Sequence, residues 1–301
     1  MNSVAIAPIW SATPTPLSAN LRVDVPSVNL MIQHAVASGI SGVFLGGTCG
    51  EGPWLPDGER SRLIEAAVKA ADGKLKVAAQ VSDNSVGRIQ DNIARAREAG
   101  ADYVVIAAPA TFMNATPSRV AALFTEAVAA SPLPVGIYDL GRHRPVVIPE
   151  DRLSAIYLLP NVRFIKDSSG SPERRAIALA ARQLKPALQL FNGDEFRCVE
   201  YLQAGYDGIM FGGAMAAAPQ LNRIARLAAA GRWEEARVVE AEMRKILYGI
   251  YGGEQIACWL TGLKYYMVRR GLFSSAASYL KYPLTDECRA FIDGQVAAEA
   301  C

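Results

Sequence analysis

The chain has 301 residues, of which 51% are hydrophobic, so it can bury one large core or two smaller ones. Lys and Arg number 31 against 29 Asp and Glu. The resulting net charge of +2 gives no field that would attract nucleic acid or an anionic membrane surface, and we therefore expect a small-molecule partner.

The first ten residues carry no basic segment before their apolar stretch, which leads directly into a loop rich in Thr and Pro. They predict a first strand rather than a signal peptide or a membrane span. The chain also has five cysteines without a C-x-x-C pair, and an odd number favours reduced thiols over a disulfide framework. We therefore expect a cytoplasmic protein. The cysteines are Cys49, Cys198, Cys258, Cys288 and Cys301.

Eight short apolar runs alternate with segments of helical period in the first 230 residues. The runs are Val4–Trp10, Gly42–Gly46, Leu75–Val81, Tyr103–Ala108, Leu133–Tyr138, Val162–Lys166, Leu188–Asn192 and Asp207–Phe211. The helical segments are Pro26–Ser38, Asp57–Ala71, Val86–Glu98, Pro117–Ala130, Glu150–Leu158, Pro172–Leu184, Glu195–Gln203 and Pro219–Ala230. Continuous apolar runs are typical of parallel strands covered by helices on both faces. Eight such units predict an α/β fold, a (β/α)8 TIM barrel.

Glycines at the ends of helical segments support this division, since Gly39, Gly100 and Gly205 each stand where a left-handed turn would end a helix. A doubly wound sheet with the same alternation is the second possibility. It is disfavoured because Ser11-Ala12-Thr13-Pro14 follows the first run in place of a dinucleotide-binding fingerprint.

Beyond the eighth unit the pattern is helical only, in the segments Arg232–Ile250, Glu254–Arg270 and Thr285–Ala298. We therefore divide the chain into a barrel over residues 1–230, which carries the active site, and a C-terminal helical region over residues 231–301. The helical region is expected to pack on the barrel or on a neighbouring subunit.

In a TIM barrel the active site lies at the carboxyl ends of the strands, and the sixth run ends there in Lys166. A lysine taken out of water loses its proton more readily, and the free amine can form a Schiff base with a carbonyl compound. A strand-terminal lysine also commonly extends to solvent or pairs with a neighbouring acid such as Asp167. From this stretch alone the second interpretation is the commoner one.

Two further strand ends carry candidate groups. The second run continues into Gly46-Gly47-Thr48-Cys49-Gly50-Glu51-Gly52, a glycine-rich loop whose backbone N–H groups can hold an anion and to which Thr48 adds a hydroxyl. A simple tight turn is the alternative. The fifth run ends at Tyr138, and a strand-end tyrosine is often a core residue whose hydroxyl is bonded to a carbonyl.

Together these stretches resemble the family of dihydrodipicolinate synthase and N-acetylneuraminate lyase. The loop Gly47–Glu51 is similar to the family's G-[TS]-T-G-E loop, Tyr138 corresponds to its strand-end tyrosine, and Phe164–Gly170 resembles its Schiff-base segment. Asn192–Glu195 and Gly262–Tyr265 resemble further family stretches. The resemblance covers essentially the whole chain and favours the covalent interpretation of Lys166.

The resemblance implies class I aldolase chemistry without a metal or another cofactor. Lys166 would condense with a 2-keto acid such as pyruvate, Tyr138 would carry protons with Thr48 as its hydrogen-bond partner, and the N–H groups near Thr48 and Cys49 would bind the carboxylate. Gly47, Thr48, Cys49, Arg142, His143 and Met210 are the expected substrate-binding residues. The resemblance also implies a homodimer or homotetramer.

Three departures from the family pattern bear on the substrate. Cys49 replaces the family's usual second threonine, which exchanges a strong hydroxyl donor for a weak thiol. Phe112 falls in the loop where dihydrodipicolinate synthases usually carry a relay tyrosine. The position of their substrate-binding arginine falls on His143 in an ungapped alignment, between Arg142 and Arg144.

These changes weigh against condensation with aspartate semialdehyde and favour another 2-keto acid lyase, acting by aldol cleavage, condensation or dehydration. Dihydrodipicolinate synthase itself, with Arg142 or Arg144 in place of the missing arginine, is the second hypothesis. A 2-keto acid binding or sensor protein without catalysis is the third. We read Asp194 and Glu195 as caps of the following helix.

Overall fold

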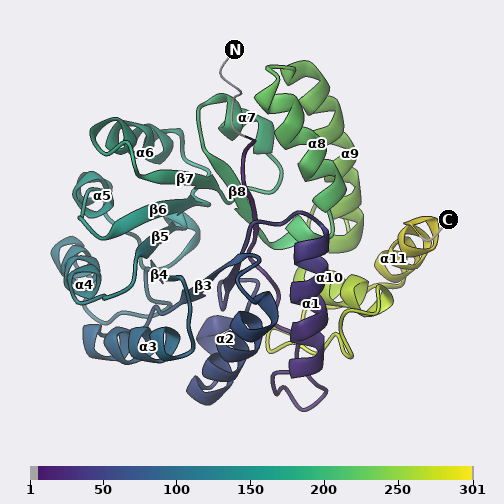
Figure 1. Cartoon of the computed structure of the whole chain (residues 1–301), viewed down its shortest axis with the longest axis horizontal. Helices are drawn as coiled ribbons and strands as arrows, with labels where there is room; N and C mark the ends of the chain where they lie inside the picture. Colours follow the sequence, from purple (N-terminus) through teal and green to yellow (C-terminus); the bar gives the residue numbers. More distant parts are fainter. Residues whose placement is uncertain (1–5, 300–301) are drawn as a thin grey trace.

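The computed structural model describes residues 6–299 and has the expected TIM barrel (Figure 1). Eight strands close into one barrel in the order β1 to β8, and every neighbouring pair is parallel. The strands are β1 Ile9–Ser11, β2 Gly42–Leu45, β3 Lys76–Gln80, β4 Tyr103–Ala107, β5 Val135–Asp139, β6 Val162–Asp167, β7 Gln189–Asn192 and β8 Gly208–Phe211.

A helix follows each strand and packs on the outside of the barrel (Figure 1). These helices are α1 Val25–Ala37, α2 Asp57–Ala71, α3 Val86–Glu98, α4 Pro117–Ala129, α5 Glu150–Tyr157, α6 Pro172–Leu184, α7 Cys198–Gln203 and α8 Ala218–Ala229. Three more helices follow the last barrel unit: α9 Trp233–Tyr251, α10 Trp259–Arg269 and α11 Asp286–Glu299. The prediction of a barrel with C-terminal helices is therefore confirmed.

Local sequence explains where the helices begin and end. The hydroxyls of Ser85 and Ser171 accept hydrogen bonds from backbone N–H groups in the first turns of α3 and α6, which satisfies donors that a helix leaves free. The predicted glycine stops are confirmed, because Gly39, Gly100 and Gly205 have φ values of +73°, +88° and +102°, a region that favours glycine.

Two predicted helix starts were wrong. Helix α7 begins at Cys198 rather than Glu195, since residues 194–197 form a turn whose side chains hold one another. Helix α10 begins at Trp259 rather than Glu254, because the left-handed residues Gly252 and Gly253 delay it. The first predicted run, Val4–Trp10, also began too early, because strand β1 begins at Ile9. Val4 and Ala5 lie outside the described residues.

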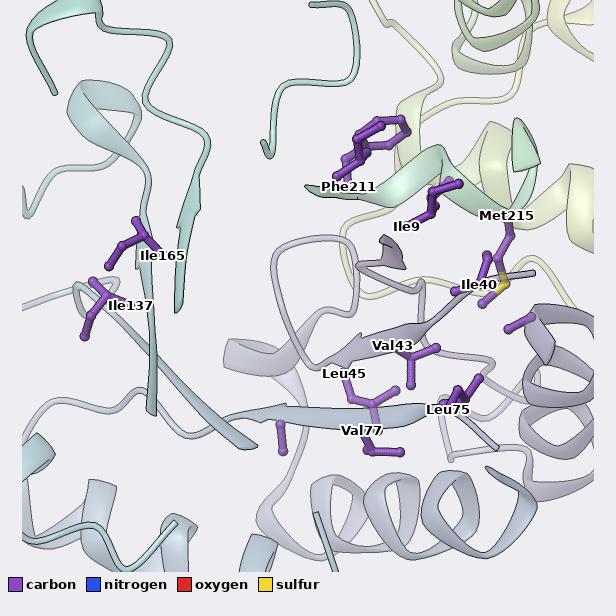
Figure 2. Close-up of a cluster of buried hydrophobic side chains, with 14 of the residues drawn as sticks. Ile9, Ile40, Val43, Leu45, Leu75, Val77, Ile137, Ile165, Phe211 and Met215 are labelled. Carbon is purple, nitrogen blue, oxygen red and sulfur yellow. The ribbon is translucent and has the colours of Figure 1, made fainter. Parts of the chain in front are cut away.

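The strands separate two apolar cores. Alternate strand residues point outward and meet the surrounding helices, as Val77, Ile137 and Ile165 do in Figure 2. The intervening residues point into the barrel, where Trp10, Phe44, Ala78, Val105, Tyr138, Phe164, Phe191 and Met210 form the inner core. Because successive strand residues face opposite sides, this division places every side chain at the strand ends either inside or outside the barrel.

Aromatic rings fill the lower half of the barrel interior. The rings of Trp10, Phe164 and Phe191 pack with centroids 5.6 to 6.0 Å apart, and Tyr103 contacts Trp10 and Phe164. Phe164 lies on β6 two residues before Lys166. A ligand inside the barrel would therefore have to lie above these packed rings, at the carboxyl ends of the strands.

The C-terminal helices pack on one side of the barrel, with α9 against α8 and with α10 and α11 against α9 (Figure 1). Cys49, Cys198, Cys258 and Cys288 are free and buried, and Cys301 lies outside the described residues. Within residues 6–299 no helix has the length and apolar character needed to cross a membrane.

Candidate active site

Lys166 and Tyr138 lie side by side at the top of the barrel interior. They are register partners on β6 and β5, and only 3% and 5% of their surfaces are exposed. The amine of Lys166 lies 3.8 Å from the centre of the Tyr138 ring and 5.0 Å from that of Phe44. Lys166 forms no ion pair with a described residue, so it does not follow the solvent-exposed or Asp167-paired interpretation.

Two buried carboxylates fix the strand ends behind these residues. Asp139, which follows Tyr138, accepts hydrogen bonds of 2.9 Å from the guanidinium of Arg174 and from the hydroxyl of Tyr157. Asp167, which follows Lys166, accepts from Tyr206 at 2.6 Å. Burial raises the pKa of Asp167, and the hydrogen bond from Tyr206 opposes that shift. Because both carboxylates point away from the interior, they orient Tyr138 and Lys166 without occupying the site.

Thr48 connects Tyr138 to an arginine. The Thr48 hydroxyl lies 3.4 Å from the Tyr138 hydroxyl, and Nη2 of Arg144 donates to the same Thr48 oxygen at 2.8 Å. An arginine cannot accept a hydrogen bond, so the Thr48 proton is free to point toward Tyr138. Of Arg142, His143 and Arg144, the residue that reaches the site is therefore Arg144.

The loop after β2 has the form expected of an anion site. The N–H groups of Thr48 and Cys49 donate no hydrogen bond to another residue of the described range 6–299. Gly46 has φ +66°, and a Cβ on Gly52 would lie 1.8 Å from the Gly46 carbonyl oxygen, so this close wrapping requires glycine. Free N–H groups in a tight, rigid loop are suited to bind a carboxylate.

A buried ion pair anchors the far end of this loop. Glu51, in a left-handed conformation with φ +55°, pairs with Lys264 of α10, and both side chains are fully buried. The other Glu51 oxygen accepts from the backbone N–H of Tyr279 at 2.7 Å and from Ser278 at 3.1 Å. The C-terminal helices therefore help to hold the anion loop in place.

Cys49 and Glu195 form the wall of the site at the end of β8. A Cβ on Gly212 would lie 2.4 Å from the Cys49 sulfur and 3.4 Å from Oε1 of Glu195. Burial, and next the Glu195 carboxylate, raises the pKa of the Cys49 thiol to about 12, which keeps it neutral. Cys49 therefore offers the weak thiol donor that the sequence predicted.

The interpretation of Glu195 as a helix cap is wrong. Its carboxylate accepts hydrogen bonds from the hydroxyl of Tyr251 on α9 and from the N–H of Gly213, at 3.1 Å. Burial raises the pKa of Glu195, and the Tyr251 hydrogen bond opposes the shift. The available signal was an acidic pair, Asp194-Glu195, one residue after the end of a predicted barrel strand.

The remaining candidates divide between the interior and the surface. Met210 is fully buried in the inner core. Arg142 is exposed and pairs with Glu150, and His143 lies beside Gly170. Both line a surface cavity of about 400 Å³ near the start of α6. No group of three or more histidine, cysteine or acidic side chains in residues 6–299 is arranged to hold a metal ion.

Comparison with known proteins agrees with this arrangement. The model of the Dihydrodipicolinate synthetase family matches residues 5–289. A 4-hydroxy-tetrahydrodipicolinate synthase from Xanthomonas campestris pv. campestris is 25% identical over 241 residues, which cover 80% of this chain and 78% of the relative.

Solved structures share the whole fold. Dihydrodipicolinate synthase from Bacteroides thetaiotaomicron superposes with a TM-score of 0.87 at 25% identity, covering 99% of this chain and 100% of that chain. A prophage protein of the dihydrodipicolinic acid synthase family from E. coli K12, in complex with pyruvate, superposes with a TM-score of 0.86 at 19% identity and covers 98% and 99% of the two chains.

The fold and the strand-end constellation define an enzyme of the class I aldolase and lyase type. The chain belongs to the dihydrodipicolinate synthetase family. The hypothesis of a binding protein without catalysis therefore loses its support.

Proposed function

We propose that the protein is a 2-keto acid lyase in which Lys166 forms a Schiff base with pyruvate or with a longer 2-keto acid that yields pyruvate. The observation that carries this proposal is the convergence of a buried amine, a phenol and a threonine hydroxyl from three different strand ends. The curated relatives named as 4-hydroxy-tetrahydrodipicolinate synthases and the neighbouring structure in complex with pyruvate support it.

In the proposed reaction the Lys166 amine adds to the ketone carbon, and water leaves to give an iminium. For aldol cleavage, the hydroxyl on C4 loses its proton while the C3–C4 bond breaks, so that the C4 fragment leaves as an aldehyde. The electron pair of the broken bond moves toward the iminium and forms an enamine. Protonation of C3 and addition of water then release pyruvate and return the amine. The keto acid's carboxylate lies against the free N–H groups of Thr48 and Cys49.

Tyr138 is the proposed proton carrier because its ring lies beside the Lys166 amine and its hydroxyl lies 3.4 Å from that of Thr48. A phenol with an ordinary pKa near ~10 is a weak base by itself. Arg144 donates to the Thr48 oxygen, which leaves the Thr48 proton available to stabilise a Tyr138 phenolate. The 3.4 Å separation between the two hydroxyls is long, and such contacts commonly tighten when substrate binds.

Within this class we favour a lyase for another 2-keto acid over the synthase that uses aspartate semialdehyde. Phe112 stands in the loop of the family's relay tyrosine, and its ring lies under the guanidinium of Arg119 with no hydroxyl to offer. One observation supports the synthase as second candidate: Arg144 reaches the site and could bind a second carboxylate.

Reductive trapping tests the Schiff base. Incubation with pyruvate and sodium borohydride should add the mass of a reduced pyruvate adduct at Lys166 alone and abolish activity, while Lys166→Ala should show neither adduct nor activity. An adduct on another lysine, or full activity of Lys166→Ala, would overturn the proposal.

The homo-oligomer and the cytoplasmic location stay predictions. Exposed apolar side chains such as Met113, Leu184 and Val238, which are 88%, 73% and 62% exposed, are consistent with subunit contacts. Light scattering at micromolar concentration would contradict the first prediction if it gave the mass of a monomer.

A further inference from the structure

Gln80, the last residue of β3, points into the barrel beside the proposed site. Its neighbours Ala79 and Val81 belong to the outer core, as does Val77, which Figure 2 shows pointing away from the interior. Gln80 pairs in register with Val105, which belongs to the inner core. The alternation of side chains along β3 and the pairing of Gln80 with an inward-facing residue both place the Gln80 side chain inside the barrel.

The height of Gln80 in the barrel matches that of the reacting groups. Ala78, one inward position below it, pairs with Phe44, whose ring lies 5.0 Å from the Lys166 amine. On the other side, a Cβ on Gly46 would lie 3.9 Å from the Cβ of Gln80, so Gln80 adjoins the anion loop. Gln80 therefore stands between the level of Lys166 and the loop.

Side chains of one barrel layer come from alternate strands. When the register is followed around the barrel, Gln80 shares its layer with Ala12, Tyr138 and Gly193. Ala12 and Gly193 carry at most a methyl group, so Gln80 and Tyr138 are the two polar side chains of this layer. A substrate bound to Lys166 extends into the space between them.

The amide oxygen of Gln80 is buried and accepts no hydrogen bond from any residue between 6 and 299. A buried acceptor without a partner costs roughly 1–3 kcal/mol, so a ligand that supplies a donor gains by it. The pyruvate portion of a substrate cannot do so, because its carboxylate and ketone oxygens only accept. The donor must come from the other portion, beyond the bond that is made or broken.

We propose that Gln80 is a specificity residue that accepts a hydrogen bond from a hydroxyl on the non-pyruvate portion of the substrate. This rests on the proposed function and narrows it to hydroxylated 2-keto acids. The alternative donor, an ammonium group, is disfavoured because Lys166 and Arg144 already bring two basic groups to the pocket. In the proposed reaction Tyr138 takes the proton of the C4 hydroxyl. The hydroxyl that donates to Gln80 is therefore the next one along the substrate, on C5.

Two substrates that differ by this single hydroxyl test the proposal: 4,5-dihydroxy-2-oxopentanoate and 4-hydroxy-2-oxopentanoate. Pyruvate release gives kcat/KM, and the half-saturating concentration for borohydride trapping at Lys166 gives binding without turnover. The wild type should prefer the dihydroxy compound by about 10-fold in either measurement, the scale of one buried hydrogen bond. Absence of a preference in the wild type would overturn the inference.

Gln80→Leu should reduce this preference to about 2-fold or less by losing activity and binding with the dihydroxy compound only. Trapping of pyruvate itself should be unchanged. The control Gln189→Leu makes the same change at an exposed position at the opposite end of the barrel and should keep the full preference. Retention of the preference by Gln80→Leu, or an equal loss with both compounds, would overturn the assignment.

Thermal unfolding separates recognition from a structural role. Gln80→Leu replaces an unpartnered buried oxygen by apolar atoms, and its Tm should rise by about 2 °C. A lower Tm together with weaker activity on both compounds would show that Gln80 supports the fold instead. If no 2-keto acid is trapped at Lys166 in the wild type, the proposed function itself is wrong. If both compounds are trapped equally well, the proposed function stands and only the role of Gln80 is wrong.

Discussion

The protein buries two lysines in different ways. Lys264 lies between α10 and the anion loop, where Glu51 pairs with its amine and the carbonyl of Ala277 accepts from it at 2.8 Å. Lys166 lies at the barrel mouth, where its amine lies near the rings of Tyr138 and Phe44. The Glu195 carboxylate is near enough to interact with it electrostatically, but no carboxylate among residues 6–299 forms an ion pair with it.

The difference between these two environments separates a structural lysine from the one that we propose forms the Schiff base. Burial lowers the pKa of Lys264, and the Glu51 carboxylate opposes that shift and holds the proton. An aromatic face attracts a cation but accepts none of its N–H groups as an oxygen does. The amine of Lys166 therefore donates to no oxygen among residues 6–299, and its hydrogen-bonding capacity is available to a substrate.

The largest effect is expected for Lys166→Met. Removal of the covalent nucleophile should lower kcat by on the order of 10⁴ or more, as in other enzymes that lose the residue forming the intermediate. Stability should stay the same or rise, because methionine fills the pocket without a polar group to desolvate. Assays of pyruvate release and urea unfolding measure the two quantities. A strongly destabilised variant would mean that Lys166 has a structural partner after all.

The same substitution at the other lysine should have the opposite result. Lys264→Met leaves the fully buried Glu51 unpaired and should lower the free energy of unfolding by about 3–5 kcal/mol. The double variant Glu51→Gln with Lys264→Met removes both charges and should recover more than half of this loss. Equal stability of the single and double variants would show that the two side chains are not coupled.

Tyr138→Phe tests whether the chemistry at Lys166 depends on its neighbour. Turnover should fall by about 10² or more, the usual contribution of a general acid or base, while borohydride trapping of pyruvate persists because the amine is untouched. Trapping and turnover measured on one preparation separate the two steps. Normal turnover would exclude Tyr138 as the proton carrier and leave another group near the site to be found.

The smallest effect should distinguish the two arginines near the tyrosine loop. Arg144→Gln removes the donor to Thr48 and should lower kcat/KM by about 10-fold, the scale of one hydrogen bond to a charged group. Arg142→Gln is the matched control, since its side chain is 87% exposed and should have little effect. Steady-state kinetics with one 2-keto acid suffice, and a larger effect of Arg142→Gln would reverse the assignment.

Local patterns in the sequence were enough to determine the barrel. Each buried strand reads as a continuous apolar run, and Gly39, Gly100 and Gly205 mark helix ends by a requirement of the backbone itself. Since the strands of a barrel all end at one mouth, the run ends also predicted that Lys166, Tyr138 and the Thr48 loop would meet. These features depend on residues close together in the chain.

Only the tertiary structure decided which distant polar groups face one another. Lys264 meets Glu51 across 213 positions of sequence, and Arg144 reaches Thr48 across 96. Whether Arg142, His143 or Arg144 enters the site depends on the path of one loop, and the unpartnered amide oxygen of Gln80 is buried only in the closed barrel. Side-chain reach and burial are properties of the closed barrel, and no local periodicity records them.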